Sequence, residues 1–482
     1  MRVLQASSEL HPFSKTGGLA DMAGALAKYL AADGHEVTVI TPLYGNMRDR
    51  FPEIDATDIS FALPLGELVV TAKLWQLSPA KRLTIYFVDQ PEFYQRAALY
   101  GDKAGDYTDN AERFVFFSKC VVELARHLPL PTEIIHAHDW QAGLVPLFVQ
   151  HARQAGDWLK APRTCLTIHN LAYQGVFPSW KFPLTNLPAS YFTPAGVEFF
   201  GWMNCLKAGL VYADMLTTVS PRYAREITTE EFGCALDGVL RERQHDLTGV
   251  LNGVDYEEWN TTHNPFLPQP YSQESLEGKA TAKAALQQEF GLPQSANVPL
   301  FGVVSRLADQ KGVDILTGAL EEMLGADIQF VLLGSGQAEF ERAVRGLAVR
   351  HPTKASVKIG YDHALSHRIE AGVDFFLMPS HFEPCGLNQM YSLRYGSVPV
   401  VRATGGLDDS IVDVTEDVES ANGIKFYEYS SRALAKAIRK AIVLFGAKEL
   451  FERYRLNGMA SDFSWKRTTT AYEEIYKRAL AK

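Results

Sequence analysis

The stretch "RVLQASSELHPFSKTGGLADMAGALAKYLAADGHEVTVIT" (residues 2–41) predicts a strand–helix–strand unit. Residues 2–6 and 36–41 are short runs rich in apolar side chains, and residues 19–34 repeat apolar side chains at helical spacing. Gly34 supplies a stop at the carboxyl end of the helix. Apolar strands joined by a helix are typical of a parallel sheet that is covered on both faces.

The same alternation continues along both halves of the chain. Further strand-like runs lie at 83–89, 133–139, 163–170, 215–220, 299–307, 328–336, 355–361, 374–380 and 397–406. A polar, proline-rich stretch begins at residue 261 and separates the two series. The sequence therefore predicts an α/β protein with two doubly wound, Rossmann-like domains at residues 1–248 and 249–461. A C-terminal helix within 462–482 is expected to pack back on the first domain.

Ligands of such folds bind at the carboxyl ends of the parallel strands, so a deep cleft between the two domains is the expected site. At 482 residues the chain is too long for a single core. The net charge of −9 argues against nucleic acid as a partner. The absence of a long apolar run or a leader, with five scattered cysteines, predicts a cytoplasmic protein without a membrane segment.

A glycine-rich loop follows the first strand. Lys15, Gly17 and Gly18 precede a helix N-terminus, where free N–H groups and the helix dipole favour a phosphate. The loop has neither the Walker spacing nor a GxGxxG fingerprint, which disfavours a P-loop kinase or an NAD enzyme. The alternative is a loop that only turns the chain and carries a solvated lysine.

Two further strand ends carry polar side chains. "HAHDWQAG" (136–143) presents Asp139, and "TIHNLAYQG" (167–175) presents His169. Asp139 could instead be the N-cap of the following helix, and His169 a packing residue. The histidines of the first motif could suggest a metal, but the sequence offers no third ligand beside them.

The second half repeats this arrangement. "SRLADQKG" (305–312) places Arg306 and Lys311 on one loop, where they could clamp a diphosphate or be ordinary surface charges. Tyr361 at the end of another strand could stack on a base.

"PSHFEPCGLNQ" (379–389) holds the carboxylate Glu383 beside a helix that Gly386 is expected to open. That carboxylate could alternatively cap the helix. The chain contains no Asp-x-Asp pair of the kind that holds a metal in many sugar transferases. A leaving diphosphate would then be neutralised by Lys15, Arg306 and Lys311, so neither a metal nor another cofactor is expected.

Seven motifs together resemble one family. "KTGGLAD", "HAHDWQ", "TIHNLAYQG", "NGVD", "SRL…QKG", "FEPCGLNQ" and "TGGL" occur in the order seen in bacterial glycogen synthases and plant starch synthases. The resemblance implies a GT-B fold and transfer of glucose from ADP-glucose to the non-reducing end of an α-1,4-glucan such as glycogen, with retention and release of ADP. UDP-glucose is the alternative donor, and the oligomeric state is left open.

The resemblance also implies residue roles. The catalytic set would be Lys15, Asp139, His169, Arg306, Lys311 and Glu383. The substrate-binding set would add Gly17, Gly18, Asp21, Asn252, Tyr361, Cys385, Gly386, Leu387, Asn388, Gly405 and Gly406. This chain departs from the commoner family string at His381, Asn388 and Ala403, where arginine, threonine and arginine are frequent.

Two other classes of protein remain as alternatives. A nucleotide-dependent dehydrogenase would fit two Rossmann-like domains but lacks the glycine fingerprint. A non-catalytic glucan-binding protein would not require the set of cations together with Glu383. Among the two TGGL strings, the first, at 16–19, is assigned to the donor phosphates. The second, at 404–407, is assigned to the sugar side of the cleft.

Overall fold

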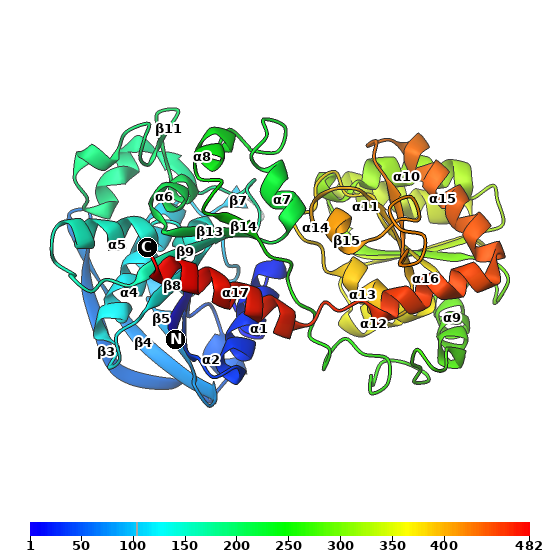
Figure 1. Cartoon of the computed structure of the whole chain (residues 1–482), viewed down its shortest axis with the longest axis horizontal. Helices are drawn as coiled ribbons and strands as arrows, with labels where there is room; N and C mark the ends of the chain where they lie inside the picture. The colour runs from blue at the N-terminus through cyan, green and yellow to red at the C-terminus, as the bar shows by residue number, and fades with distance from the viewer. Residues whose placement is uncertain (103–104) are drawn as a thin grey trace. The chain divides into compact units, whose positions relative to one another are not determined.

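The computed structural model describes residues 1–102 and 105–482 and forms two compact units (Figure 1). The first unit comprises residues 1–219, 224–253 and 465–482, and the second comprises 220–223 and 254–464. Within the described ranges, no helix is long and apolar enough to cross a membrane.

The first unit is built on a nine-stranded sheet. Its strand order is β14 (Leu247–Gly249), β13 (Met215–Thr218), β9 (Arg163–Ile168), β8 (Ile134–His138), β1 (Arg2–Ala6), β2 (Glu36–Pro42), β5 (Leu83–Asp89), β4 (Leu68–Ala80) and β3 (Asp55–Leu65). The strands from β14 to β5 pair in parallel. Because β1, β8 and β9 are neighbours, the loops that follow them start from the same edge of the sheet.

The edge formed by β4 and β3 differs from the predicted parallel sheet. Both strands are antiparallel, and they are joined by Gly66, whose φ is +63°, and Glu67. Only Phe61 and Leu65 of β3 are buried, so one face of this hairpin meets water. The interrupted pattern of apolar residues on β3 is typical of an antiparallel edge rather than of a strand covered on both faces.

Helices surround this sheet, and the C-terminal helix is among them. The main helices are α1 (Gly18–Ala32), α4 (Asn110–His127), α5 (Val145–Gln154), α6 (Cys205–Tyr212) and α17 (Trp465–Leu480). In Figure 1, α17 (red) lies beside α1, and the Trp465 ring stacks on Tyr29 with centroids 6.0 Å apart. Tyr472 and Tyr476 of α17 are buried in the first unit, which fixes the end of the chain there.

Shorter elements complete this part of the chain. They are α2 (Met47–Arg50), α3 (Pro91–Tyr94), α7 (Pro221–Glu226), α8 (Asp237–Glu242), β6 (Gly101–Asp102), β7 (Gly105–Asp106), β10 (Val176–Pro178), β11 (Glu198–Phe199) and β12 (Trp202–Asn204).

The second unit contains an all-parallel sheet of six strands. The order is β17 (Ala355–Ile359), β16 (Gln329–Gly336), β15 (Leu300–Leu307), β18 (Phe375–Met378), β19 (Val398–Arg402) and β20 (Ile424–Phe426). Its helices are α9 (Glu277–Glu289), α10 (Val313–Met323), α11 (Ala338–Arg350), α12 (His363–Gly372), α13 (Asn388–Arg394), α14 (Gly405–Ser410), α15 (Ser431–Gly446) and α16 (Lys448–Ala460).

Both faces of this second sheet are covered. Successive residues of a strand point to opposite faces, and Leu300 and Phe301 of β15 belong to two different buried clusters. Phe301 packs in the cluster that contains Leu316 of α10 and Leu434 of α15. The predicted doubly wound α/β fold is therefore confirmed for this half. Polar side chains lie at the ends of the strands, outside these apolar clusters.

Candidate active site

The first glycine-rich loop is held by a carboxylate that the sequence motifs do not include. Glu9 is 3% exposed and accepts hydrogen bonds from the Thr16 N–H (2.6 Å), the Thr16 hydroxyl (2.5 Å) and the Gly17 N–H (3.3 Å). Lys15 lies beside this anchored backbone and pairs with Asp21, with its Nζ 2.7 Å from Oδ1. The loop thus presents a half-exposed cation at the start of α1.

Gly17 leaves open space in front of this loop. A Cβ on Gly17 would meet no atom of the described residues within 4 Å. Gly18 follows as the first residue of α1. A ligand could therefore approach the backbone closely at this point, as the sequence predicts for a phosphate.

Asp139 has a strained backbone at the end of β8. Its φ is +53°, a conformation that costs a non-glycine residue free energy and often marks a functional site. Its Oδ1 accepts a hydrogen bond from the His169 N–H at 2.7 Å, and the carboxylate makes no capping bond to the described 3₁₀ helix Trp140–Ala142. Asp139 therefore stands at the N-cap position of this helix, but its side chain does not cap the helix and turns to the neighbouring strand end instead.

Burial sets the protonation of this group of side chains. It raises the pKa of Asp139 to about 7, although the backbone N–H groups of His169 and Asn170 act in the opposite direction. It lowers the pKa of His169 to about 3, so the imidazole is neutral at neutral pH. His138 Nδ1 lies 3.1 Å from His169 Nε2, which links the two rings. The site can thus offer neutral hydrogen-bonding groups and a carboxyl that titrates near pH 7.

His136 makes hydrogen bonds within the core and has no ring nitrogen left for a metal. Its Nδ1 lies 2.8 Å from the Tyr476 hydroxyl on α17, and its Nε2 lies 2.6 Å from the Thr167 hydroxyl. Burial lowers the pKa of His136 to about 3. Because both ring nitrogens have protein partners, the histidine pair of "HAHD" does not form a metal site.

In the second unit, the buried Glu383 forms an ion pair with the partly buried Lys311. Lys311 Nζ lies 2.6 Å from Glu383 Oε2, and the Ser380 hydroxyl donates to the same oxygen at 2.9 Å. Glu383 is only 5% exposed. Gly312, with φ at +68°, allows the chain to pass Pro379, because a Cβ there would lie 2.0 Å from the Pro379 carbonyl oxygen. This close crossing brings the lysine loop against the carboxylate loop.

The second TGGL string supports the Glu383 segment. The Gly406 N–H donates to the carbonyl oxygens of Glu383 and Pro384, each at 3.1 Å. A Cβ on Gly405 would lie 1.9 Å from the Glu383 carbonyl oxygen, and one on Gly406 would lie 2.1 Å from that of Cys385. Both glycines are thus required for backbone packing behind the carboxylate.

The helix after Glu383 begins later than predicted. Gly386 has φ at +73°, Leu387 is the N-cap, and α13 starts at Asn388. The Asn388 side-chain amide donates to the Val304 carbonyl at 2.6 Å. Asn388 therefore ties the start of α13 to β15, the strand that carries Arg306.

Three predicted residues lie apart from these contacts. Arg306 is exposed at the end of β15 and has no ion-pair partner in residues 1–102 and 105–482. Tyr361 is 76% exposed just after β17. Asn252 is buried after β14, and its Oδ1 has no hydrogen-bond partner among the described residues. The sequence motifs did not identify Glu9, which binds the first glycine-rich loop, or Ser380, which donates to Glu383. The only indication of either residue in the sequence is that it lies three to eight residues from a motif residue.

Comparisons with known proteins agree with this architecture. The starch synthase catalytic domain family matches residues 2–242, and the glycosyl transferases group 1 family matches residues 287–449. The glycogen synthase of Anaeromyxobacter sp. (strain Fw109-5) is 47% identical over the whole of both chains. That of Koribacter versatilis (strain Ellin345) is 45% identical over 99% of this chain and 98% of its own.

Solved structures show the same relationship. The catalytic domain of starch synthase IV from Arabidopsis thaliana, bound to ADP and acarbose, has a TM-score of 0.90 and 33% identity over 100% of this chain and 99% of its own. A sucrose-phosphate synthase from Thermosynechococcus elongatus, 16% identical, shares the fold with a TM-score of 0.63 over 100% and 99% of the two chains.

The two Rossmann-like units and the cation–carboxylate site define a glycosyltransferase of the GT-B fold. The chain belongs to the glycogen synthase and starch synthase family of α-1,4-glucan glucosyltransferases.

Proposed function

We propose that the chain transfers glucose from ADP-glucose to the non-reducing end of an α-1,4-glucan, with retention of configuration and release of ADP. The observation that carries this proposal is the pair of Lys311 with the buried Glu383; Lys311 lies five residues after Arg306, a cation of β15 without an ion pair in the described residues. The Arabidopsis starch synthase IV structure, bound to ADP and acarbose, supports an adenine nucleotide donor and a glucan acceptor.

The cations would stabilise the leaving diphosphate. Arg306 brings a positive charge that no carboxylate in the described residues neutralises, while Lys311 must divide its hydrogen bonds between Glu383 and the ligand. Lys15 would add a third cation, held in place by the anchored loop behind it. Positive charge that is already in place around a leaving group lowers the activation free energy by several kcal/mol, typically by about 3 kcal/mol for one hydrogen-bond donor.

Glu383 would bind hydroxyl groups of the donor glucose. Its Oε2 is occupied by Lys311 and Ser380, so the carboxylate is fixed before substrate arrives. In the proposed step, the bond from C1 to the phosphate oxygen breaks while the acceptor 4-hydroxyl forms its bond to C1 on the same face. The departing phosphate takes the proton of that hydroxyl, so no protein nucleophile and no metal take part.

The remaining residues would shape the substrate pockets. Asp139 and neutral His169 would line the pocket of the transferred glucose, and Tyr361 would lie against the adenine. Gly17, Gly18 and Asp21 would accompany Lys15 at the phosphates. The others in the substrate-binding set are Asn252, Cys385, Gly386, Leu387, Asn388, Gly405 and Gly406. We assign the acceptor and catalytic domain to residues 1–248, the nucleotide-sugar domain to 249–461, and the returning helix to 462–482.

A donor panel tests this proposal. The protein is supplied with ADP-, UDP- or GDP-glucose and glycogen, and incorporation of labelled glucose is measured. We expect the highest kcat/KM with ADP-glucose. A higher value with UDP-glucose would favour the alternative donor, and no incorporation from any donor would favour a non-catalytic glucan-binding protein.

A further inference from the structure

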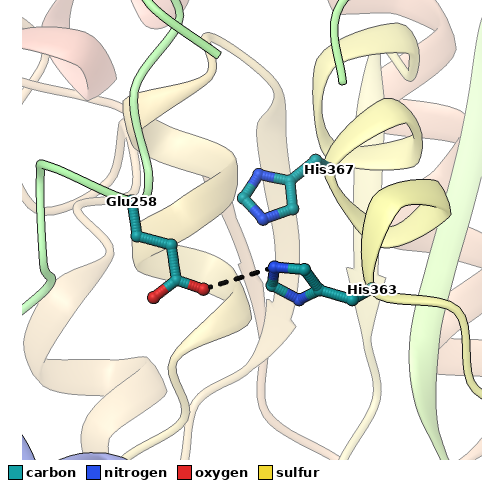
Figure 2. Close-up of side chains that lie close together, drawn as sticks. All are labelled: Glu258, His363 and His367. Atoms are coloured by element: carbon teal, nitrogen blue, oxygen red, sulfur yellow. Dashed lines mark ion pairs between the residues drawn. The ribbon is translucent and has the colours of Figure 1, made fainter. Parts of the chain in front are cut away.

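A cluster of three potential metal ligands lies in the second unit and shares no residue with the proposed active site. Glu258, His363 and His367 each offer one ligand atom, and these atoms lie within 4.8 Å of one another. Figure 2 shows the three side chains turned toward a common space. His363 and His367 are four residues apart at the start of α12, which places them on the same face of the helix.

The buried member of the cluster, His367, is held in a fixed orientation. Its ring stacks on Trp259 with centroids 4.0 Å apart, and its Nδ1 lies 2.8 Å from the Tyr395 hydroxyl and 3.0 Å from Asn264 Nδ2. The Tyr395 oxygen can accept from Nδ1–H, and an acceptor behind one ring nitrogen is what orients metal-binding histidines.

The other ring nitrogen of His367 has no partner. Nε2 is fully buried and makes no hydrogen bond within the described part of the chain, which is costly for a polar atom. Metal binding at Nε2 needs the tautomer that carries its proton on Nδ1, and the Tyr395 hydroxyl oxygen, 2.8 Å away, can accept a hydrogen bond from that N–H.

The two outer ligands, Glu258 and His363, are more exposed than His367 and lie close together. Their side chains are each 42% exposed, and His363 Nε2 lies 3.5 Å from Glu258 Oε1. Two ligand atoms bonded at about 2.0–2.1 Å in a tetrahedral zinc site lie about 3.3–3.4 Å apart. The pair thus needs almost no change in spacing to bind zinc, and the exposed side of the cluster leaves room for water.

We infer that Glu258, His363 and His367 form a binding site for one divalent transition-metal ion, best matched by zinc, with water as the fourth ligand. Two imidazoles and a carboxylate suit zinc, whereas magnesium and calcium prefer an all-oxygen shell. The ion would join the segment after β14 to the first turn of α12. Tyr361 lies two residues before His363, so the ion would also restrain the loop that carries this tyrosine.

The binding test uses the full chain, freed of metal with EDTA and titrated with zinc against a chromophoric chelator. A Cys234→Ser background removes the one exposed thiol among the five cysteines. We expect one zinc ion per chain, bound at least tenfold more weakly after either His363→Gln or Glu258→Gln. His245→Gln changes another exposed histidine and is the matched control; it should bind zinc as the parent does.

Cobalt substitution identifies the ligands. A site of two histidines and a carboxylate should give visible d–d bands without a sulfur-to-cobalt charge-transfer band, and His363→Gln should remove the d–d bands. The inference is overturned if the parent binds no stoichiometric zinc, or if both variants retain the parent affinity. Both altered side chains are half-exposed, so circular dichroism should show folded variants.

This result is separable from the proposed glucosyl transfer. Transfer is expected to continue in EDTA, because no catalytic step uses a metal. Loss of zinc binding in the variants with transfer retained supports both assignments, whereas transfer without any zinc site in the parent overturns only this one.

Discussion

Lys311 Nζ lies 2.6 Å from Glu383 Oε2, and the Ser380 hydroxyl donates to the same oxygen. The carboxylate is therefore fixed from two sides, while its own backbone rests on Gly406. In the proposed reaction, an incoming diphosphate would compete for the lysine, and its arrival would leave Glu383 to be satisfied by sugar hydroxyls. This exchange would link donor binding to the charge of one buried carboxylate.

Replacing Glu383 tests this link. Glu383→Gln keeps the shape of the side chain but removes its charge, and Glu383→Ala removes the group entirely. We expect each to lower kcat by about 10²–10³-fold, the usual cost of one preorganised electrostatic contact. Glu321→Gln, which alters an exposed carboxylate paired with Arg350, should leave kcat unchanged. Near-normal turnover by Glu383→Ala would refute the site assignment.

Arg306→Ala should reduce activity without reducing stability. The side chain is exposed and has no ion pair within the described residues, so its removal should change the free energy of unfolding by no more than about 0.5 kcal/mol. Turnover with ADP-glucose should fall by about two orders of magnitude. Arg350→Ala is the control for a surface arginine. Equal kinetics for the two variants would show that Arg306 is an ordinary surface charge.

Two glycine substitutions should differ in their effect on stability. Gly405→Ala adds a Cβ 1.9 Å from the Glu383 carbonyl oxygen at a φ of +46°, so we expect a loss of about 2 kcal/mol or more. In Gly17→Ala the new Cβ is at least 4 Å from every described atom, and φ is −159°, so the melting temperature should hardly change.

The kinetics of the same pair provide the second readout. Gly17→Ala should raise KM for ADP-glucose, because the added methyl group would stand between backbone and phosphate. Gly405→Ala should lower kcat by displacing Glu383. An unaltered KM in Gly17→Ala would show that this glycine does not face the donor.

Asp139 should govern the pH dependence near neutrality. Burial raises its pKa in the folded protein to about 7, above the value of an unfolded chain near 4. If the ionised form acts on the substrate, kcat/KM should rise as pH increases through 7, and Asp139→Asn should abolish that rise. If kcat/KM of Asp139→Asn still rose through pH 7, the titrating group would be a residue other than Asp139.

The same shift predicts a stability effect. The folded protein binds the Asp139 proton more tightly than the unfolded chain does, so its contribution to the free energy of unfolding is present below about pH 4 and decreases between pH 4 and 7. The difference between wild type and Asp139→Asn, measured by denaturant unfolding at several pH values, should follow this direction.

Much of the fold could be predicted because burial leaves a strong pattern. β1, α1 and β2 coincide closely with the apolar runs and helical spacing of residues 2–41. The β3–β4 hairpin was missed because a half-solvated edge has no continuous apolar run. Its antiparallel pairing depends on the turn at Gly66, which the alternation of strands and helices does not indicate.

The site was only partly predictable, because its contacts join residues that lie far apart in the sequence. Lys311 and Glu383 lie in separate motifs, and their contact at 2.6 Å depends on a chain crossing that Gly312 permits. Glu9 belongs to no periodic pattern, although it fixes the first glycine loop. Likewise, the spacing of His363 and His367 is readable in the sequence, whereas the approach of Glu258 depends on tertiary structure.

The most direct test of the proposed reaction is a paired measurement of ADP release and glucan labelling from ADP-glucose, in EDTA, with and without glycogen. We predict equal amounts of ADP and incorporated glucose, dependence of both on glycogen, and a fall of both in Glu383→Gln. Release of ADP without labelling of glycogen, or no release at all, would contradict the assignment of glucosyl transfer to this site.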